Sequence, residues 1–251
     1  ETVSNDYPHI RADTKQRVLD AIEQLGYRPN LSARGLRSGR TGVIGLAVPA
    51  LRENYFAELA DSIIRAAEKR GLGVMVEQTS GEREAELLAV SGGRRRFMDG
   101  LLFSPKSLGQ GDAAALDVGF PMVLLGERIF GGPTDHVTMH NVSSARAAVD
   151  HLLQLGRRRI ALIGADLADQ DETSSASLRL RGYRDALTAA GIELSPTLGR
   201  PAEPWNRASG AGATRVLIGE GVRVDRVVSL DDTRGLGAPR ACVERGVGAP
   251  A

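Results

Sequence analysis

Two adjacent carboxylates, Asp231 and Asp232, directly follow a short apolar run at 226–230 that predicts a β-strand. Paired carboxylates serve in general acid–base chemistry or in holding a cation. Neighbouring residues of a strand point to opposite sides, so only one of this pair could serve a common site. The pair by itself therefore leaves catalysis, cation binding and simple ligand contact open.

The lone tryptophan, Trp205, lies in a polar loop between a proline and an asparagine. A single tryptophan is usually a core residue, but these polar flanks favour an exposed or cleft-lining ring. An indole face stacks well on the apolar face of a sugar. Trp205 is therefore a candidate for contact with a small ligand.

A basic segment lies near the start of the chain, where every charged residue between Arg28 and Arg40 is an arginine. The net charge of the whole chain is only +1, so this segment is a local feature. Its arginines could contact the phosphates of a nucleic acid. The alternative is a flexible linker, since Gly35 and Gly39 would each cost about 1 kcal/mol in a helix.

Common enzyme motifs are absent from the sequence, including GxGxxG after a strand, GxxxxGK[ST], GxSxG and HExxH. The histidines do not have the spacing of metal ligands. We therefore expect neither an enzyme nor a bound metal or cofactor. The single cysteine, Cys242, together with the lack of a signal peptide or a membrane-spanning run, favours a cytoplasmic protein that does not bind membranes.

The elements that must position these residues follow from hydrophobic patterning. A chain of 251 residues can hold two core-bearing units. Short apolar runs alternate with helical patterns, which predicts parallel sheets with helices on both faces and a ligand cleft beyond the strands' carboxyl ends. Strands are expected at 43–48, 73–77, 100–103, 122–125, 136–139, 159–163 and 226–229, and helices at 56–70, 82–97, 143–155, 178–190, 208–219 and 233–245.

A further helix is expected before the basic segment, because Val18, Ile22 and Leu25 recur at helical spacing. Pro29 should end it, since proline disfavours the α conformation in the residue before it. A compact helical element, a basic tether and a large α/β domain suggest a DNA-binding headpiece joined to a ligand-sensing domain.

Several short motifs occur together in a fixed order over nearly the whole chain. They are Thr2-Val3-Ser4, Tyr27-Arg28-Pro29-Asn30, Val43-Ile44-Gly45-Leu46, Asp99-Gly100-Leu101-Leu102, the run at 153–163, Arg179-Leu180-Arg181-Gly182-Tyr183 and Asp231-Asp232-Thr233. In this order they resemble the lactose/galactose-repressor (LacI/GalR) family of transcription regulators. Against that family both ends of the chain are expected to be incomplete.

The resemblance implies an α/β fold of two doubly wound parallel-sheet subdomains, similar to periplasmic binding proteins. Its implied domains are a partial helix-turn-helix headpiece at 1–26, a hinge at 27–42, an N-terminal effector-binding subdomain at 43–142 and an incomplete C-terminal one at 143–251. Within the hinge, Leu36 would enter the minor groove as an apolar wedge. The implied DNA contacts are Thr2, Ser4, Asn5, His9, Tyr27, Asn30, Ala33, Arg34 and Leu36.

The same resemblance implies contacts to a small-molecule effector from the loops of the cleft. Arg179 would supply a forked pair of donors, and Asp231 stands where the family most often has asparagine. Phe56 could equally pack in the core. The implied effector contacts are Tyr55, Phe56, Ser104, Thr173, Ser175, Arg179, Trp205 and Asp231.

The function implied is that of a ligand-responsive DNA-binding transcriptional regulator, a homodimeric repressor on palindromic operator DNA. A sugar is the preferred effector class, with a purine or another metabolite left open. The runner-up interpretation is a cytoplasmic sugar-binding module that does not bind DNA.

Overall fold

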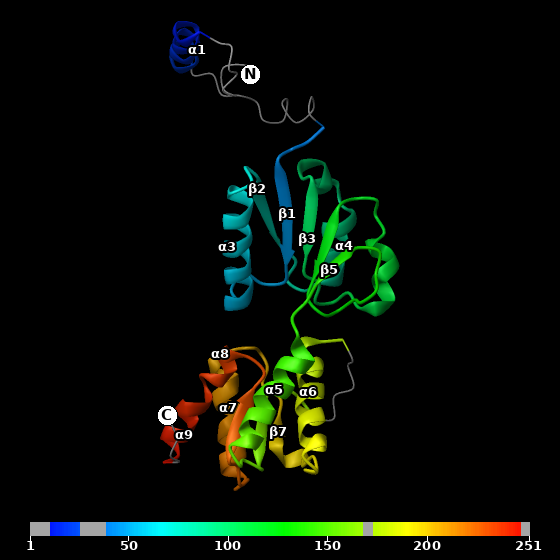
Figure 1. Cartoon of the computed structure of the whole chain (residues 1–251), viewed down its shortest axis with the longest axis vertical. Coiled ribbons are helices and arrows are strands. Elements are labelled where there is room, and N and C mark those ends of the chain that lie inside the picture. Colours follow the sequence, from blue (N-terminus) through cyan, green and yellow to red (C-terminus); the bar gives the residue numbers. More distant parts are fainter. Residues whose placement is uncertain (1–10, 26–38, 168–172, 247–251) are drawn as a thin grey trace.

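The computed structural model describes residues 11–25, 39–167 and 173–246 (Figure 1). Every residue expected to contact DNA lies outside these ranges. Helix α1 (Ala12–Gln24) confirms the expected first helix, but it ends five residues before Pro29. None of the described helices is long and apolar enough to cross a membrane.

The first parallel sheet has the order β2-β1-β3-β4-β5. The chain moves outward from β1 to β2 and then returns past β1 to β3, which is a doubly wound arrangement. The strands are β1 (Val43–Val48), β2 (Gly73–Gln78), β3 (Gly100–Phe103), β4 (Met122–Leu125) and β5 (Asp135–Val137), and the helices between them are α3 (Asn54–Glu68) and α4 (Arg83–Ser91).

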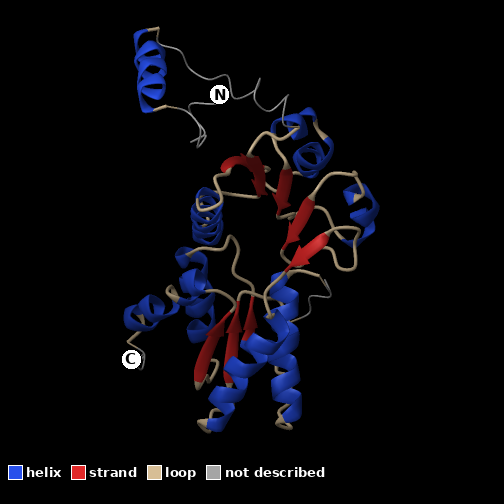
Figure 2. Ribbon diagram, turned by 45° about the horizontal axis from the view of Figure 1, so that its top comes forward, coloured by secondary structure: helices blue, strands red, loops and turns tan. Residues whose placement is uncertain are grey.

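The second sheet is also parallel, with the order β7-β6-β8 among the described strands. Helices flank its strands on both sides (Figure 2). Its strands are β6 (Ile160–Ile163), β7 (Gly199–Arg200) and β8 (Arg226–Ser229), and its helices are α5 (Asn141–Gln154), α6 (Ser175–Ala189), α7 (Arg207–Gly219), α8 (Asp232–Gly235) and α9 (Ala238–Glu244).

Alternation along the central strands explains why helices cover both faces of each sheet. In β1, Leu46 and Val48 pack with residues of α3, whereas Ala47 packs with residues of α4. In β6, Ile160 and Leu162 join the cluster of α5 and α6, and Ala161 and Ile163 join that of α7 and α9. Strands buried on both faces have nearly continuous apolar sequences, which is why the sequence identified them.

All of the long strands fall where the sequence predicted them, but two of the expected helices are interrupted. The helix expected at 82–97 ends at Ser91, because Gly92 is extended, and the chain continues as a 3₁₀ helix, η1 (Gly93–Phe97). The helix expected at 233–245 divides into α8 and α9. Pro239, which lacks an N–H group, occupies the first turn of α9, where no such group is needed.

In each sheet an aspartate joins the amino ends of two neighbouring strands. Asp99, just before β3, accepts hydrogen bonds from the backbone N–H groups of Thr41 (2.6 Å) and Gly42 (2.9 Å), which precede β1. Asp225, just before β8, accepts them from residues 158 and 159, both at 2.8 Å, which precede β6. The two sheets therefore have the same aspartate–backbone hydrogen bonding at corresponding positions.

The hydrogen bonds of these aspartates predict that the stability of the fold depends on pH. The hydrogen bond from the Thr41 backbone N–H, followed by that from Gly42, holds the pKa of Asp99 below its usual value. The contribution of Asp99 to the free energy of unfolding is therefore present above the unfolded-state pKa and is lost as pH falls through the folded-state pKa. We expect Asp99→Asn to lower the free energy of unfolding at neutral pH by about 1 kcal/mol. It should also flatten the loss of stability on acidification, measured by urea unfolding at several pH values. Asp61→Asn, at an exposed carboxylate paired with Arg65, is the control; equal pH dependence of the Asp99 variant and the wild type would refute this role of Asp99.

Candidate functional site

A buried polar network joins the carboxyl end of the first sheet to the second unit. Asn141, in the first turn of α5, donates from Nδ2 to Glu127 Oε1 (2.6 Å). Its Oδ1 accepts from Arg179 Nε (2.7 Å). Asn141 is only 4% exposed and Glu127 only 8%. Glu127 follows β4 and Arg179 lies on α6, so one amide holds together elements of both units.

Arg179 lies in the second turn of α6 and is partly buried, so it is not an exposed residue at a helix start. Ser174 fixes that start, because its hydroxyl accepts the backbone N–H of Ser177 (3.0 Å). The Nη1 of Arg179 also donates to the carbonyl oxygen of Leu230, which follows β8. Burial lowers the pKa of Arg179, while the nearby acids Glu127 and Asp231 act in the opposite direction.

Tyr55 and Phe56 begin α3 at the carboxyl end of β1, and their rings meet edge to face with centroids 5.0 Å apart. Tyr55 is 49% exposed. Burial of the remainder raises the pKa of Tyr55, and Glu127 raises it further, while Arg179 lowers it. The phenol is therefore close to the network. Phe56 instead packs against the core cluster of Leu46 and Val48, which fits its alternative role as a core residue.

Trp205 and Asp231 are linked through Arg234, a side chain that is fully buried. Asp231 is the N-cap of α8, where it accepts the backbone N–H of Arg234 (2.9 Å) and pairs with its guanidinium. The Arg234 Cζ lies 3.8 Å from the centroid of the Trp205 ring. Asp231 is thus engaged within the protein, and Asp232 is exposed in the first turn of α8. The two carboxylates do not form an acid–base pair.

The other expected effector contacts lie near the same sheet ends. Ser104 is 7% exposed and follows β3. A Cβ atom placed on Gly126 would be 3.9 Å from the Ser104 hydroxyl, so Ser104 lies beside the end of β4. Thr173 and Ser175 are partly buried where α6 begins, and Ser175 shares a helix face with Arg179 four residues later.

Sequence reasoning missed Glu127, Asn141 and Arg234. Each follows the carboxyl end of a strand, respectively β4, β5 and β8, and this position in a parallel sheet could have identified them. His136, whose ring nitrogen contacts the Gly126 carbonyl oxygen, has a structural contact rather than a ligand role. In the described part of the chain, no three metal-binding side chains lie together.

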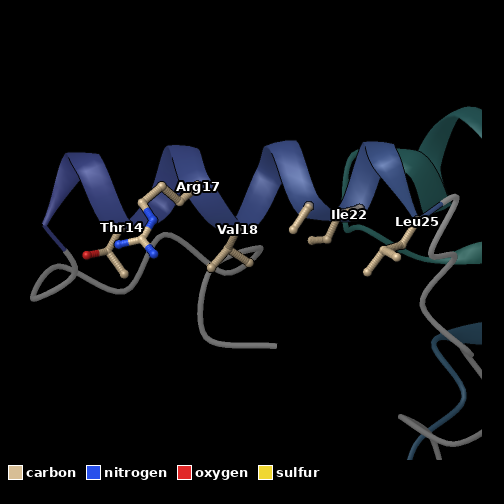
Figure 3. A pocket seen from close by; sticks show the side chains of 6 residues that line it. Thr14, Arg17, Val18, Ile22 and Leu25 are labelled. Atoms are coloured by element: carbon tan, nitrogen blue, oxygen red, sulfur yellow. The ribbon is translucent and has the colours of Figure 1, made fainter.

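Two hollows differ in chemical character. One of about 250 Å³ adjoins the network and is lined by Asn141, Arg179, Tyr183, Ser229 and Leu230 among others. A larger one of about 470 Å³ runs along α1, where Figure 3 shows the labelled apolar side chains on one side of the helix. Its described lining comes from one amphipathic helix with few polar groups, so the polar network is the better ligand site.

Comparisons with known proteins agree with this architecture. Residues 149–251 match the family model described as a periplasmic binding protein-like domain. The regulator CelR of Thermobifida fusca is 32% identical over 95% of this chain and 71% of its own length. A solved CelR–cellobiose complex is 31% identical, covers 99% of this chain and 74% of that one, and has a TM-score of 0.67.

Two further structures are similar. A LacI-family transcriptional regulator from Sanguibacter keddieii is 49% identical over 84% of this chain and 74% of that one, with a TM-score of 0.75. The lac repressor dimer bound to operator and the anti-inducer ONPF is 29% identical over 98% of this chain and 73% of that one, with a TM-score of 0.82. The chain belongs to the LacI/GalR family of transcriptional regulators.

Proposed function

We propose that this chain is a cytoplasmic DNA-binding regulator whose affinity for operator DNA changes when a neutral sugar occupies the cleft between its two sheets. The observation that carries the proposal is the Glu127–Asn141–Arg179 network, which spans both units at the carboxyl ends of their strands. A ligand that competes for these groups would alter how the units are held together. That coupling between cleft and DNA must be reciprocal.

The charges around the network favour an uncharged ligand. Arg179 and Arg234 are accompanied by Glu127 and Asp231, so two basic side chains face two acidic ones. A phosphate or an organic acid would find its attraction to the arginines opposed by the carboxyl groups. The hydroxyls of a sugar can both donate to carboxyl oxygens and accept from guanidinium groups. Tyr55 and Trp205 add aromatic surface for its apolar face.

The relatives support both halves of the proposal. The CelR complex contains cellobiose, and the lac repressor dimer is bound to operator. We propose the corresponding division here: a headpiece at 1–26, a hinge at 27–42 and subdomains at 43–142 and 143–251. Two exposed apolar side chains, Leu236 (58%) at the C-cap of α8 and Val243 (75%) on α9, support self-association as a homodimer.

A thermal-shift screen followed by DNA binding tests the proposal. Cellobiose and other neutral sugars are compared with sugar phosphates and nucleobases. A sugar at 100 times its Kd should stabilise the protein by about 2.7 kcal/mol. Fluorescence anisotropy then compares a palindromic operator-like duplex with a scrambled one at moderate salt, with and without that sugar.

The expected result is a thermal shift with neutral sugars, a preference for the palindrome and a change in that preference when sugar is added. Stabilisation by sugar phosphates or nucleobases alone would contradict the assigned ligand class. Sugar binding with equal affinity for both duplexes would leave a sugar-binding module without regulatory activity.

A further inference from the structure

Arg234 ties together the three segments that leave the carboxyl ends of the second sheet. Its Nε pairs with Asp231, which follows β8. Its Nη1 donates to the carbonyl oxygens of Gly164 (3.1 Å), after β6, and Ala202 (3.3 Å), after β7. A buried guanidinium is costly unless its charge and donors are matched. These contacts pair the charge of Arg234 and satisfy most of its N–H donors, so they fix the position of its side chain.

The guanidinium is also enclosed on two sides. A Cβ atom on Gly164 would lie 2.7 Å from the Arg234 Cζ, so the glycine backbone must approach the guanidinium directly. The Trp205 ring covers it with its centroid 3.8 Å from the same Cζ. Among the described residues, Arg234 Nη2 is buried without a hydrogen-bond partner, which is a cost. Contact with the indole offsets part of that cost.

We propose that Arg234 is the positioning residue of the effector site, because it holds the Trp205 indole in place and occupies the Asp231 carboxylate. The inference rests on the proposed effector site and deepens it. Trp205 is partly exposed although Arg234 lies against it, so part of its ring stays open to a ligand. The ring, rather than a free Asp231 carboxylate, then meets the apolar face of a neutral sugar.

The sole tryptophan of the chain makes this inference directly measurable, since all tryptophan emission comes from Trp205. Arg234→Met keeps much of the side-chain volume and removes the charge and the donors. Arg207→Met removes a charge from an exposed arginine two residues from the ring and serves as the matched control. The readouts are the emission maximum of the ligand-free protein, its quenching by acrylamide, and the affinity for cellobiose or the best sugar of the screen.

In Arg234→Met we expect red-shifted emission and stronger quenching, approaching that of free N-acetyltryptophanamide, with circular dichroism unchanged. Sugar affinity should fall about fivefold to thirtyfold, as expected for loss of a desolvated cation–π contact. Arg207→Met should behave like the wild type in each measurement. Arg234→Lys, which keeps the charge but not the planar fork, should give intermediate quenching.

Unchanged Trp205 quenching and emission in a folded Arg234→Met variant would overturn the proposal. If that variant does not fold, Arg234→Lys decides by the same measurement, and wild-type quenching there has the same meaning. Because the quenching experiment contains no ligand, a wild-type protein that binds no sugar would refute the proposed function separately from the positioning of Trp205.

Discussion

Replacing Arg179 with alanine should weaken binding of the effector roughly 30-fold or more, equivalent to about 2 kcal/mol or more for loss of charged hydrogen bonds. Arg179 contacts Asn141 and the Leu230 carbonyl, and so it links the elements of both units that a ligand must bridge. Truncation would also leave Glu127 without its nearest basic neighbour in this network. Isothermal titration calorimetry with the sugar identified by the thermal-shift screen measures the effect.

Arg181→Ala is the matched control, because Arg181 lies on the same helix and is exposed. It should bind the sugar with wild-type affinity. Arg179→Lys separates charge from geometry: it keeps the positive charge but cannot form the planar fork, so its affinity should stay well below that of the wild type. Wild-type affinity in Arg179→Ala would remove this residue from the effector site.

Replacing Gly182 with alanine should destabilise the second unit by about 3 kcal/mol, at the upper end of the cost of overpacking. Helices α5 and α6 touch here through their backbones. A Cβ atom on Gly182 would overlap the Val142 carbonyl oxygen and lie 2.9 Å from the Arg146 amide nitrogen. Neither group can move without shifting α5, whose first turn contains Asn141. Urea unfolding followed by circular dichroism measures the loss.

Gly212→Ala, in the same unit, is expected to stabilise the protein rather than destabilise it. Gly212 lies within α7, and a Cβ atom there would meet nothing within 4 Å. Alanine should therefore stabilise the protein by about 0.5–1 kcal/mol, because it reduces the conformational freedom of the unfolded chain. Similar changes in stability for the two variants would show that backbone contact at Gly182 does not decide its cost.

The fold was predictable to the extent that burial on both faces produces long apolar runs. Strands β1 and β6 are such runs, and their positions follow from the sequence. The break within the expected helix at 82–97 was not predicted, and the break within the one at 233–245 was signalled only by Pro239. They depend on Gly92 adopting an extended conformation and on Gly237 approaching the Ala211 amide, 2.6 Å from where a Cβ atom would lie. Tertiary contacts of this kind leave no periodic signal.

The site was predictable in location but not in its partnerships. Arg179 and Tyr55 lie at the sheet ends, near enough for each to affect the pKa of the other, and their contact with an effector stays a prediction. Asp231 was expected to face a ligand, but its carboxylate caps α8 and pairs with Arg234. The position of Arg234 after β8 makes it a site candidate, but its partners do not follow from the sequence, because they depend on a glycine 70 residues earlier that leaves room for the guanidinium.

The hydrogen bonds of Asp99, which join the amino ends of β1 and β3, have a mechanical consequence. Asp99 fastens Thr41 and Gly42 to the base of β3, at the edge of the first sheet that is remote from Asn141. A rotation of this unit about the crossing between β5 and α5 must therefore carry the start of β1 as one rigid body. A change in the angle of this unit at the cleft would therefore be transmitted directly to Thr41. Thr41 lies next to the basic segment at 28–40.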